Sequence, residues 1–237
     1  MSKLLVFLML VKYKRGKHGQ ILNDYFSGLT AWSAIKCASI CRGSRVLVIG
    51  GAGGVGQIAT QILAKYLRCH VTVFASSRDH PMMSNLGAQT VIDNRENSEA
   101  VRELDKVDAV IDCAGIGVEN IGSHLNLGDI LSPGGRFVSL SSPVLNNTDK
   151  LGILPGTLSS ISTLMQENMK TGNYSTRWAF FQPDIQALDL MRRLVDEKVL
   201  TVSVSKVFSF DKLPDAYDEA DGPVGGKFVI DVSQNKV

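Results

Sequence analysis

Short apolar runs alternate with longer amphipathic segments along the first 140 residues of the chain. The apolar runs have the length of strands, and the segments between them repeat apolar residues at helical spacing. The predicted strands are 45–49, 70–75, 90–92, 107–112 and 136–140, and the predicted helices are 57–66, 98–104 and 120–131. Strands that alternate with helices at this spacing predict an α/β fold with a doubly wound parallel sheet.

A glycine-rich turn follows the first predicted strand and precedes the first helix. Three of its glycines fit G-x-G-x-x-G, in which glycine permits the tight bend, the approach of a pyrophosphate and close helix–strand packing. The start of the helix would also present free N–H groups to the phosphates. We therefore predict a Rossmann domain that binds a dinucleotide, and a purely structural turn is the alternative. The residues assigned to the cofactor here are Gly51, Ala52, Gly53, Gly54, Val55 and Gly56.

The tip of the second predicted strand indicates which dinucleotide binds. It ends in Ser76, Ser77 and Arg78, whereas an NAD site would carry Asp or Glu for the ribose 2′-hydroxyl. Two hydroxyls and a guanidinium suit a 2′-phosphate, so the tip predicts NADPH. Asp79 comes next, and we interpret it as the N-cap of the following helix, with Pro81 in its first turn, rather than as a ribose ligand.

Further residues are expected to line the same cleft, because ligands of doubly wound sheets lie beyond the carboxyl ends of the strands. For each of these residues alone, packing or capping is the other interpretation, and their shared position favours the cofactor. They are Ser76, Asn94, Cys113, Ala114, Leu140 and Ser141, of which the last two would face the nicotinamide.

Composition and charge limit the chemistry. A formal net charge of +2, without a basic stripe interleaved with aromatic residues, argues against a nucleic-acid partner. The four cysteines and four histidines lack the spacing of metal ligands, so no metal site is predicted. Catalytic residues stay unassigned, which suits a hydride-transfer enzyme because the cofactor carries the chemistry.

The N-terminus combines an apolar run, 4–11, with basic residues that follow it. The run is too short to cross a bilayer, so we predict no stable membrane span. A signal peptide would carry its charge before the apolar run. A mitochondrial presequence would be poor in acidic residues, as this segment is before Asp24, but also rich in Arg and Ser, which this segment is not. We therefore interpret 1–27 as an atypical extension, either a remnant strand or an unstructured segment.

Several segments of the chain resemble the medium-chain dehydrogenase/reductase superfamily. They are 28–35, the turn at 50–56, 86–88, 91–93 and 226–230. The similarity is to the zinc-independent quinone oxidoreductases, and 151–153, Tyr174 and 177–181 are similar to a mitochondrial branch of them. The resemblance implies hydride transfer from NADPH to a quinone or an activated alkene (enone), and a mitochondrial location with the cytoplasm as the alternative. It also implies a homodimer through the edge strand at Arg177 to Phe181.

The superfamily pattern also predicts the organisation of the chain. The resemblance implies longer family members, with a GroES-like catalytic domain before the segment that matches residue 28 onward. In this sequence only 27 residues precede residue 28. We expect an isoform, a gene-model fragment or a degenerate copy that keeps the cofactor-binding half. The expected parts are the extension 1–27, the Rossmann domain 28–200 and the segment 201–237, a remnant of the truncated catalytic domain. A non-catalytic nucleotide-binding or protein-interaction module is the competing function.

Overall fold

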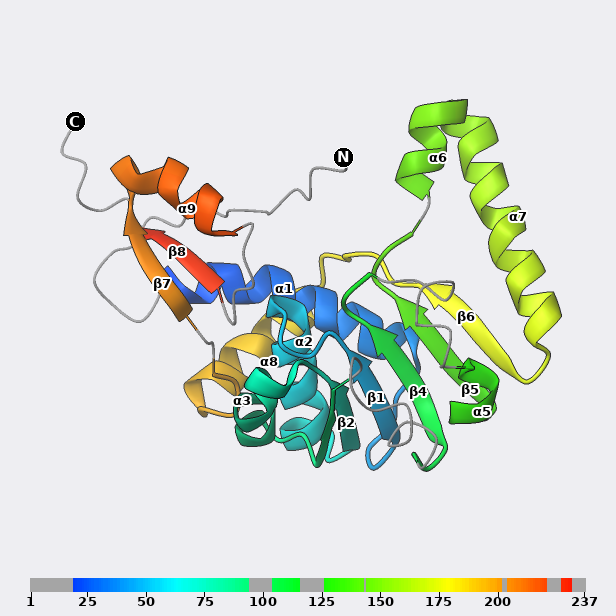
Figure 1. Cartoon of the computed structure of the whole chain (residues 1–237), viewed down its shortest axis with the longest axis horizontal. Coiled ribbons are helices and arrows are strands. Elements are labelled where there is room, and N and C mark those ends of the chain that lie inside the picture. Colours follow the sequence, from blue (N-terminus) through cyan, green and yellow to red (C-terminus); the bar gives the residue numbers. More distant parts are fainter. Residues whose placement is uncertain are drawn as a thin grey trace.

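The computed structural model describes residues 19–93, 104–115, 126–142, 144–201, 204–220 and 227–231. At its centre lies a six-stranded parallel sheet with the order β3-β2-β1-β4-β5-β6 (Figure 1). The strands are β1 (Arg45–Ile49), β2 (His70–Phe74), β3 (Thr90–Ile92), β4 (Val107–Asp112), β5 (Leu131–Ser139) and β6 (Tyr174–Trp178). The order reverses between β1 and β4, so the doubly wound sheet expected from the sequence is confirmed.

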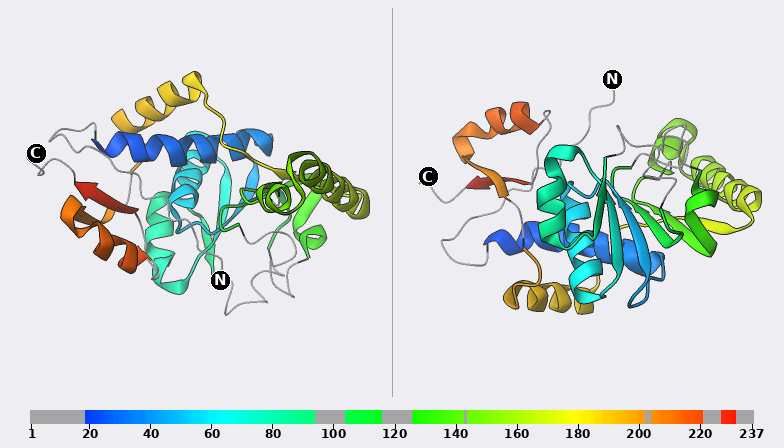
Figure 2. Two further views of the ribbon diagram at one scale, coloured as in Figure 1. Left: turned by 90° about the horizontal axis from the view of Figure 1, so that it is seen from above. Right: turned by 60° about the horizontal axis from the view of Figure 1, so that its bottom comes forward.

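Helices cover both faces of the sheet. One face packs against α1 (Gly19–Cys37), α2 (Gly54–Gln61), α3 (His80–Leu86) and α8 (Ile185–Asp196), and the other packs against α5 (Leu127–Ile130) (Figure 2). Successive residues of a strand point to opposite faces, so Val46 and Val48 enter one core while Leu47 and Ile49 enter the other. All four of these side chains are buried.

Two smaller units stand at opposite sides of the sheet (Figure 1). One is a helical hairpin of α6 (Val144–Leu151) and α7 (Ile153–Thr171). The other joins the parallel pair β7 (Val204–Ser209) and β8 (Lys227–Asp231) to α9 (Leu213–Ala220) around the buried residues Phe208, Ala216 and Ile230. No helix in the described parts of the chain is long and apolar enough to cross a membrane.

The structure corrects the expected edge strand. β6 ends at Trp178, which pairs with the last residue of β5, Ser139. Phe180 and Phe181 therefore lie beyond the end of the strand, and both side chains are exposed. The expected strand at Arg177 to Phe181 keeps only its first two residues within β6, although β6 does lie at the sheet edge.

Other element boundaries also differ from those expected from the sequence. The residue Leu131 begins β5 rather than ending a helix, and α5 is the described part of the helix expected at 120–131. The α6–α7 hairpin had no counterpart among the expected elements. α1 begins at Gly19, so the expected boundary between 27 and 28 falls inside this helix. Asn94 and most of the helix expected at 98–104 lie outside the described residues.

Candidate cofactor site at the carboxyl edge of the sheet

The strand register brings the predicted site residues to one edge of the sheet. Ile49 of β1 pairs with Phe74 of β2 and with Asp112 of β4, Asp112 pairs with Ser139 of β5, and Ser139 pairs with Trp178. Each of these strands ends at this row. The predicted residues follow directly after it: the glycine turn after β1, 76–78 after β2, 113–114 after β4 and 140–141 after β5.

The glycines of the turn differ in what surrounds them. A Cβ on Gly51 would collide with the side chain of Val73, and a Cβ on Gly56 would collide with the carbonyl of Gly50. A Cβ on Gly53 would meet only the Gly50 oxygen, at 3.3 Å, and Gly53 is exposed. The turn is therefore packed tightly on its inner side and open at Gly53, which is the shape that a bound pyrophosphate requires.

The start of α2 supplies donors toward that open side. The first helical bond runs from Gln57 N–H to the oxygen of Gly53, the N-cap residue, at 2.9 Å. The N–H groups of the first turn, at Gly54 and Val55, consequently have no acceptor within the helix. The N–H of Gly53 donates instead to Gly50 at 3.1 Å, so it serves the turn itself.

Asp112 is a site residue that the sequence analysis did not single out. Its carboxylate is fully buried and accepts the N–H of Ala114 at 3.1 Å, the N–H of Gly115 at 3.0 Å and the hydroxyl of Ser139 at 3.1 Å. The hydroxyl of Ser139 in turn accepts the N–H of Ser141 at 3.2 Å. One carboxylate thus fixes the loops after β4 and β5, and a polar residue closing a buried strand was its only signal in the sequence.

Cys113 is positioned by the same loop but is unsuited to nucleophilic chemistry. Burial, and secondly the charge of Asp112, raise the pKa of the Cys113 thiol to about 12. A thiol with this pKa stays protonated near neutral pH, whereas a thiolate is the reactive form. Cys113 is therefore a candidate lining residue rather than a nucleophile.

The tip of β2 carries more negative charge than the sequence indicated. The N–H and hydroxyl of Ser77 both donate to Asp93, at 2.7 and 2.5 Å, and Asp93 follows β3. Arg78 lies 3.5 Å from the carboxylate of Asp79. Asp79 does stand at the N-cap of α3, as expected, but its side chain makes no capping hydrogen bond.

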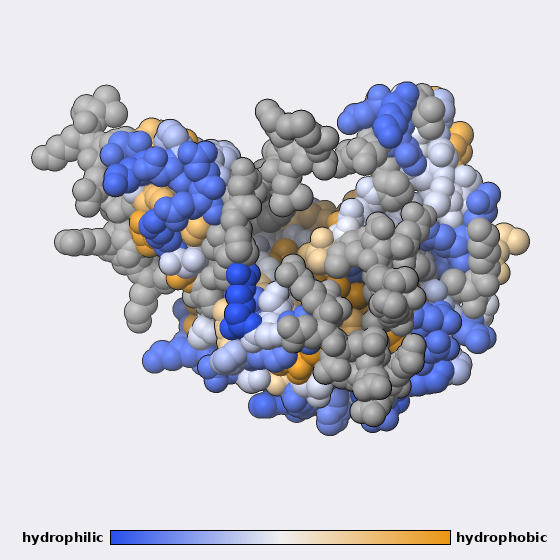
Figure 3. Space-filling view, viewed as in Figure 1, coloured by the Kyte–Doolittle hydropathy of each residue, from blue (hydrophilic) through white to orange (hydrophobic). Residues whose placement is uncertain are grey.

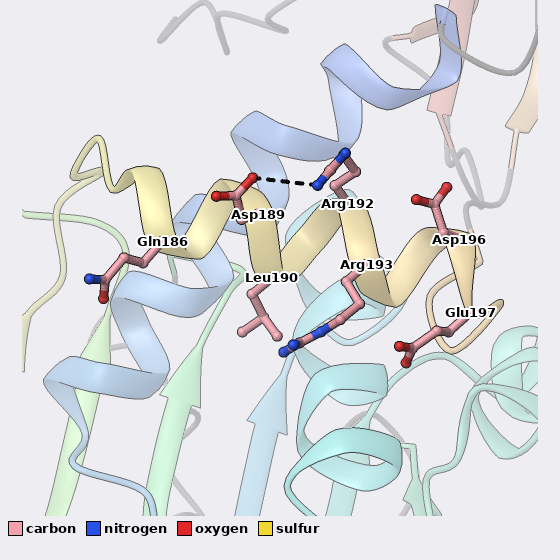
Figure 4. Close-up of a pocket in the computed structure, with 7 residues that line it drawn as sticks. All are labelled: Gln186, Asp189, Leu190, Arg192, Arg193, Asp196 and Glu197. Carbon is pink, nitrogen blue, oxygen red and sulfur yellow. Dashed lines mark ion pairs between the residues drawn. The ribbon is translucent and has the colours of Figure 1, made fainter.

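The described residues around the strand ends leave a depression. Figure 3 shows a hollow between the α6–α7 side and the β7–β8–α9 side, with apolar residues visible in its depth. A second depression lies elsewhere, along α8, and is lined by Gln186, Asp189, Leu190, Arg192, Arg193, Asp196 and Glu197 (Figure 4). Its charges include an Asp189–Arg192 pair at 3.9 Å, and none of its residues belongs to the strand ends. Among the described residues, no three His, Cys, Asp or Glu side chains gather as a metal site would require.

Comparison with known proteins decides the family. A family model described as zinc-binding dehydrogenase matches residues 86–230. The chain belongs to this family. The match agrees with the expected medium-chain dehydrogenase/reductase superfamily. Among solved structures, the chain is similar to the quinone oxidoreductase from Coxiella burnetii. That structure has a TM-score of 0.65, is 29% identical, and the alignment covers 87% of this chain and 58% of that one.

Curated relatives give the branch. The protein named NAD(P)H oxidoreductase RTN4IP1, mitochondrial, of Danio rerio is 32% identical over 95% of this chain and 60% of its own length. Its Homo sapiens counterpart is 34% identical over 93% of this chain and 57% of its own length. The expected similarity to the mitochondrial branch is thus confirmed. The chain spans little more than half the length of these two relatives.

Proposed function

We propose that this chain binds NADPH and forms the cofactor half of an oxidoreductase that reduces a quinone or an activated alkene. The observation that carries the proposal is the row Phe74–Ile49–Asp112–Ser139–Trp178, beyond which every described residue assigned to the cofactor lies. A nicotinamide dinucleotide is the cofactor named for the relatives. NADPH in particular rests on Ser76 and Arg78 at the β2 tip.

Each part of the edge has a role in this proposal. The N–H groups of Gly54 and Val55 hold the pyrophosphate, and Ser76 and Arg78 hold the 2′-phosphate. Leu140 and the loop that Asp112 fixes exclude water from the nicotinamide. When bound, the reduced nicotinamide supplies a hydride, and a proton from water completes the reduction of a quinone to a hydroquinone.

The competing proposal is a non-catalytic nucleotide-binding or interaction module. The chain aligns with 60% of the length of the Danio rerio relative, and this competing proposal requires only that the chain binds the nucleotide. The relatives' names also support a mitochondrial location, and imaging of a tagged full chain would show whether it lies in mitochondria or in the cytoplasm.

Calorimetry on the full chain with NADPH and NADH tests the cofactor, and NADPH oxidation with a small naphthoquinone tests turnover. Arg78→Ala should weaken NADPH by about 10- to 100-fold, because a charge-assisted phosphate contact contributes roughly 1.5–3 kcal/mol, and should leave NADH nearly unchanged. Arg42→Ala, an exposed arginine near the amino edge of the sheet, is the matched control. A preference for NADH, or no binding of either, overturns the proposal; binding without turnover supports the module.

We also propose a homodimer in which the edge strand β6 faces its twofold mate. The edge already has one local partner, because the side-chain amide of Asn168 on α7 bonds both main-chain groups of Thr176. Thr176 N–H donates to Asn168 Oδ1 at 2.6 Å, and Asn168 Nδ2 donates to Thr176 O at 3.1 Å. A mate that extends the sheet must therefore replace Asn168 at Thr176 or pair with β6 beside it.

A further inference from the structure

The tips of β2 and β3 are joined by a carboxylate. Phe74 pairs with Ile92, and the N–H of Ala75 donates to the oxygen of Ile92 at 3.1 Å, so the residues that follow the two strands lie side by side. Asp93 uses this proximity to accept both donors of Ser77. The proton of the Ser77 hydroxyl is thus directed to Asp93, and toward a ribose site the hydroxyl presents its lone pairs.

The guanidinium of Arg78, between the described residues Ala75 and Asp93, also has an anionic neighbour. The Arg78 Nε lies 3.5 Å from Asp79 Oδ2, and the Asp79 side chain is only 12% exposed, whereas the Arg78 side chain is 52% exposed. Asp79 makes no capping bond that would divert its charge to α3. Part of the positive potential of Arg78 is therefore cancelled where a 2′-phosphate would bind.

The charge balance follows from these contacts. From Ala75 to Asp93 the chain carries one cationic side chain, Arg78, and two anionic ones, Asp79 and Asp93, with His80 counted as neutral. A 2′-phosphate adds close to two negative charges, and like charges at this range repel. A ribose diol is neutral and can donate hydrogen bonds to a carboxylate or to the lone pairs of a serine.

We infer that Asp93 and Asp79 limit cofactor selectivity at this tip, so that the site accepts NADH as well as NADPH and Asp93 keeps NADH competitive. This inference rests on the proposed cofactor site. Asp93 acts here in two ways. Its charge repels the 2′-phosphate, and its hydrogen bond to Ser77 keeps the hydroxyl proton of Ser77 from the phosphate. Removal of its charge should therefore strengthen NADPH binding specifically, rather than weaken both cofactors.

The test uses two pairs of ligands that differ only by the 2′-phosphate. Calorimetry on the full chain measures the dissociation constants of NADPH and NADH, and of their adenosine halves 2′,5′-ADP and 5′-AMP. Asp93→Asn should shift the ratio of the two constants about tenfold toward the phosphorylated ligand, and Asp79→Asn should shift it in the same direction by less. Asp105→Asn makes the same change in net charge at the opposite edge of the sheet, just before β4, and should leave the ratio unchanged.

The outcomes separate the inference from the proposal on which it rests. Equal weakening of both ligands by Asp93→Asn would show that Asp93 only shapes the turn, and would overturn the inference. An unchanged ratio with intact binding would overturn it too, while the cofactor site would stand. No binding of either dinucleotide by the unaltered chain would overturn both. Ser77→Ala adds a second readout, because it should improve the phosphorylated ligand or leave it unchanged, and a selective loss contradicts the assigned direction of the hydroxyl.

Discussion

Two helices of equal length, α1 and α7, are each 19 residues long but bury opposite kinds of side chain. In the described side chains of α1, Ala31, Ala34 and Ile35 are no more than 2% exposed and enter the main core. α7 instead exposes its large apolar residues, with Met169 at 84%. The exposed apolar residues of α7 are Ile153, Leu154, Leu158, Ile161, Met165 and Met169.

The inner face of α7 explains the difference, because it is small and polar. Gly156 packs against the backbone of α6, where a Cβ would collide with Asn147 and Thr148. Ser160 is fully buried, and its hydroxyl accepts a hydrogen bond from the side-chain amide of Asn147 at 2.9 Å. Asn168 faces β6. The helix is thus amphipathic, as a core helix is, but its apolar face is the exposed one. A contiguous apolar row of this kind on a surface marks an interaction site, whereas α1 already has its partners in α2 and α8.

The largest expected effect compares the same substitution on the two helices. Ala34→Asp places a carboxylate in the core and should cost more than about 4 kcal/mol of the free energy of unfolding, enough to prevent folding. Leu158→Asp, on a residue that is 66% exposed, should change it by less than about 0.5 kcal/mol. Urea unfolding followed by circular dichroism measures both.

The control for this comparison is protein concentration. If Leu158→Asp costs as much stability as a core substitution, and the cost grows with the concentration of the unaltered chain, then the outer face of α7 is covered by a second copy in solution. A large cost that does not depend on concentration would contradict the description of this face as unpartnered.

The sequence was sufficient for the centre of the sheet because its signals are local. The apolar run of β1, the glycines that follow and the amphipathic start of α2 are consecutive, so pattern and turn chemistry locate them together. The parallel, doubly wound character of the sheet followed from the alternation of strands with helices. Each residue predicted by its place after a strand, where the structure describes it, lies at the same edge.

What the sequence could not supply depends on the pairing of distant residues. Asp112 and Asp93 became site residues only through bonds to Ser139 and Ser77, which lie 27 and 16 positions away. The sequence placed the end of β6 too late, because the aromatic run continues past Trp178, which pairs with the last residue of β5. The α6–α7 hairpin was not among the predicted elements. The sequence could not show that the apolar face of α7 is exposed while its small residues, such as Gly156 and Ser160, are buried.

A second prediction concerns association beside α7. In sedimentation velocity the unaltered chain should form a dimer at micromolar concentration, and Phe180→Lys should weaken it at least about tenfold by placing charge next to the β6 edge. Phe210→Lys changes an equally aromatic, 39% exposed residue next to β7 and serves as the control. Asn168→Ala exposes the main-chain groups of Thr176 and should strengthen the dimer. A monomer unaffected by all three variants would refute pairing through this edge.

The smallest effect tests the link that fastens α8 to α1. Asp184 accepts the Lys36 ammonium of α1 at 2.8 Å and caps α8 by accepting the N–H of Ala187 at 3.1 Å. These bonds, the one from Lys36 first, hold the pKa of the Asp184 carboxyl below its ordinary value near 3.8. A carboxyl whose pKa is lower in the folded state stabilises the fold above the unfolded pKa, and this stabilisation is lost as the pH falls through the folded one.

Asp184→Asn should therefore lower the Tm slightly at pH 7, and this difference should vanish as the pH falls below 3.8 and through the lower pKa of the folded state, since asparagine keeps the cap but not the charge. Thermal unfolding of both proteins across this range measures the difference. Asp189→Asn, on the same helix, removes a carboxylate whose pair with Arg192 is 3.9 Å long and exposed, and should change the Tm at pH 7 by less than Asp184→Asn does. If the Tm difference for Asp184→Asn persists at low pH, the effect comes from capping geometry. The charge of Asp184 would then contribute nothing to the contact between α1 and α8, a contact without an equivalent on the outer face of α7 among the described residues.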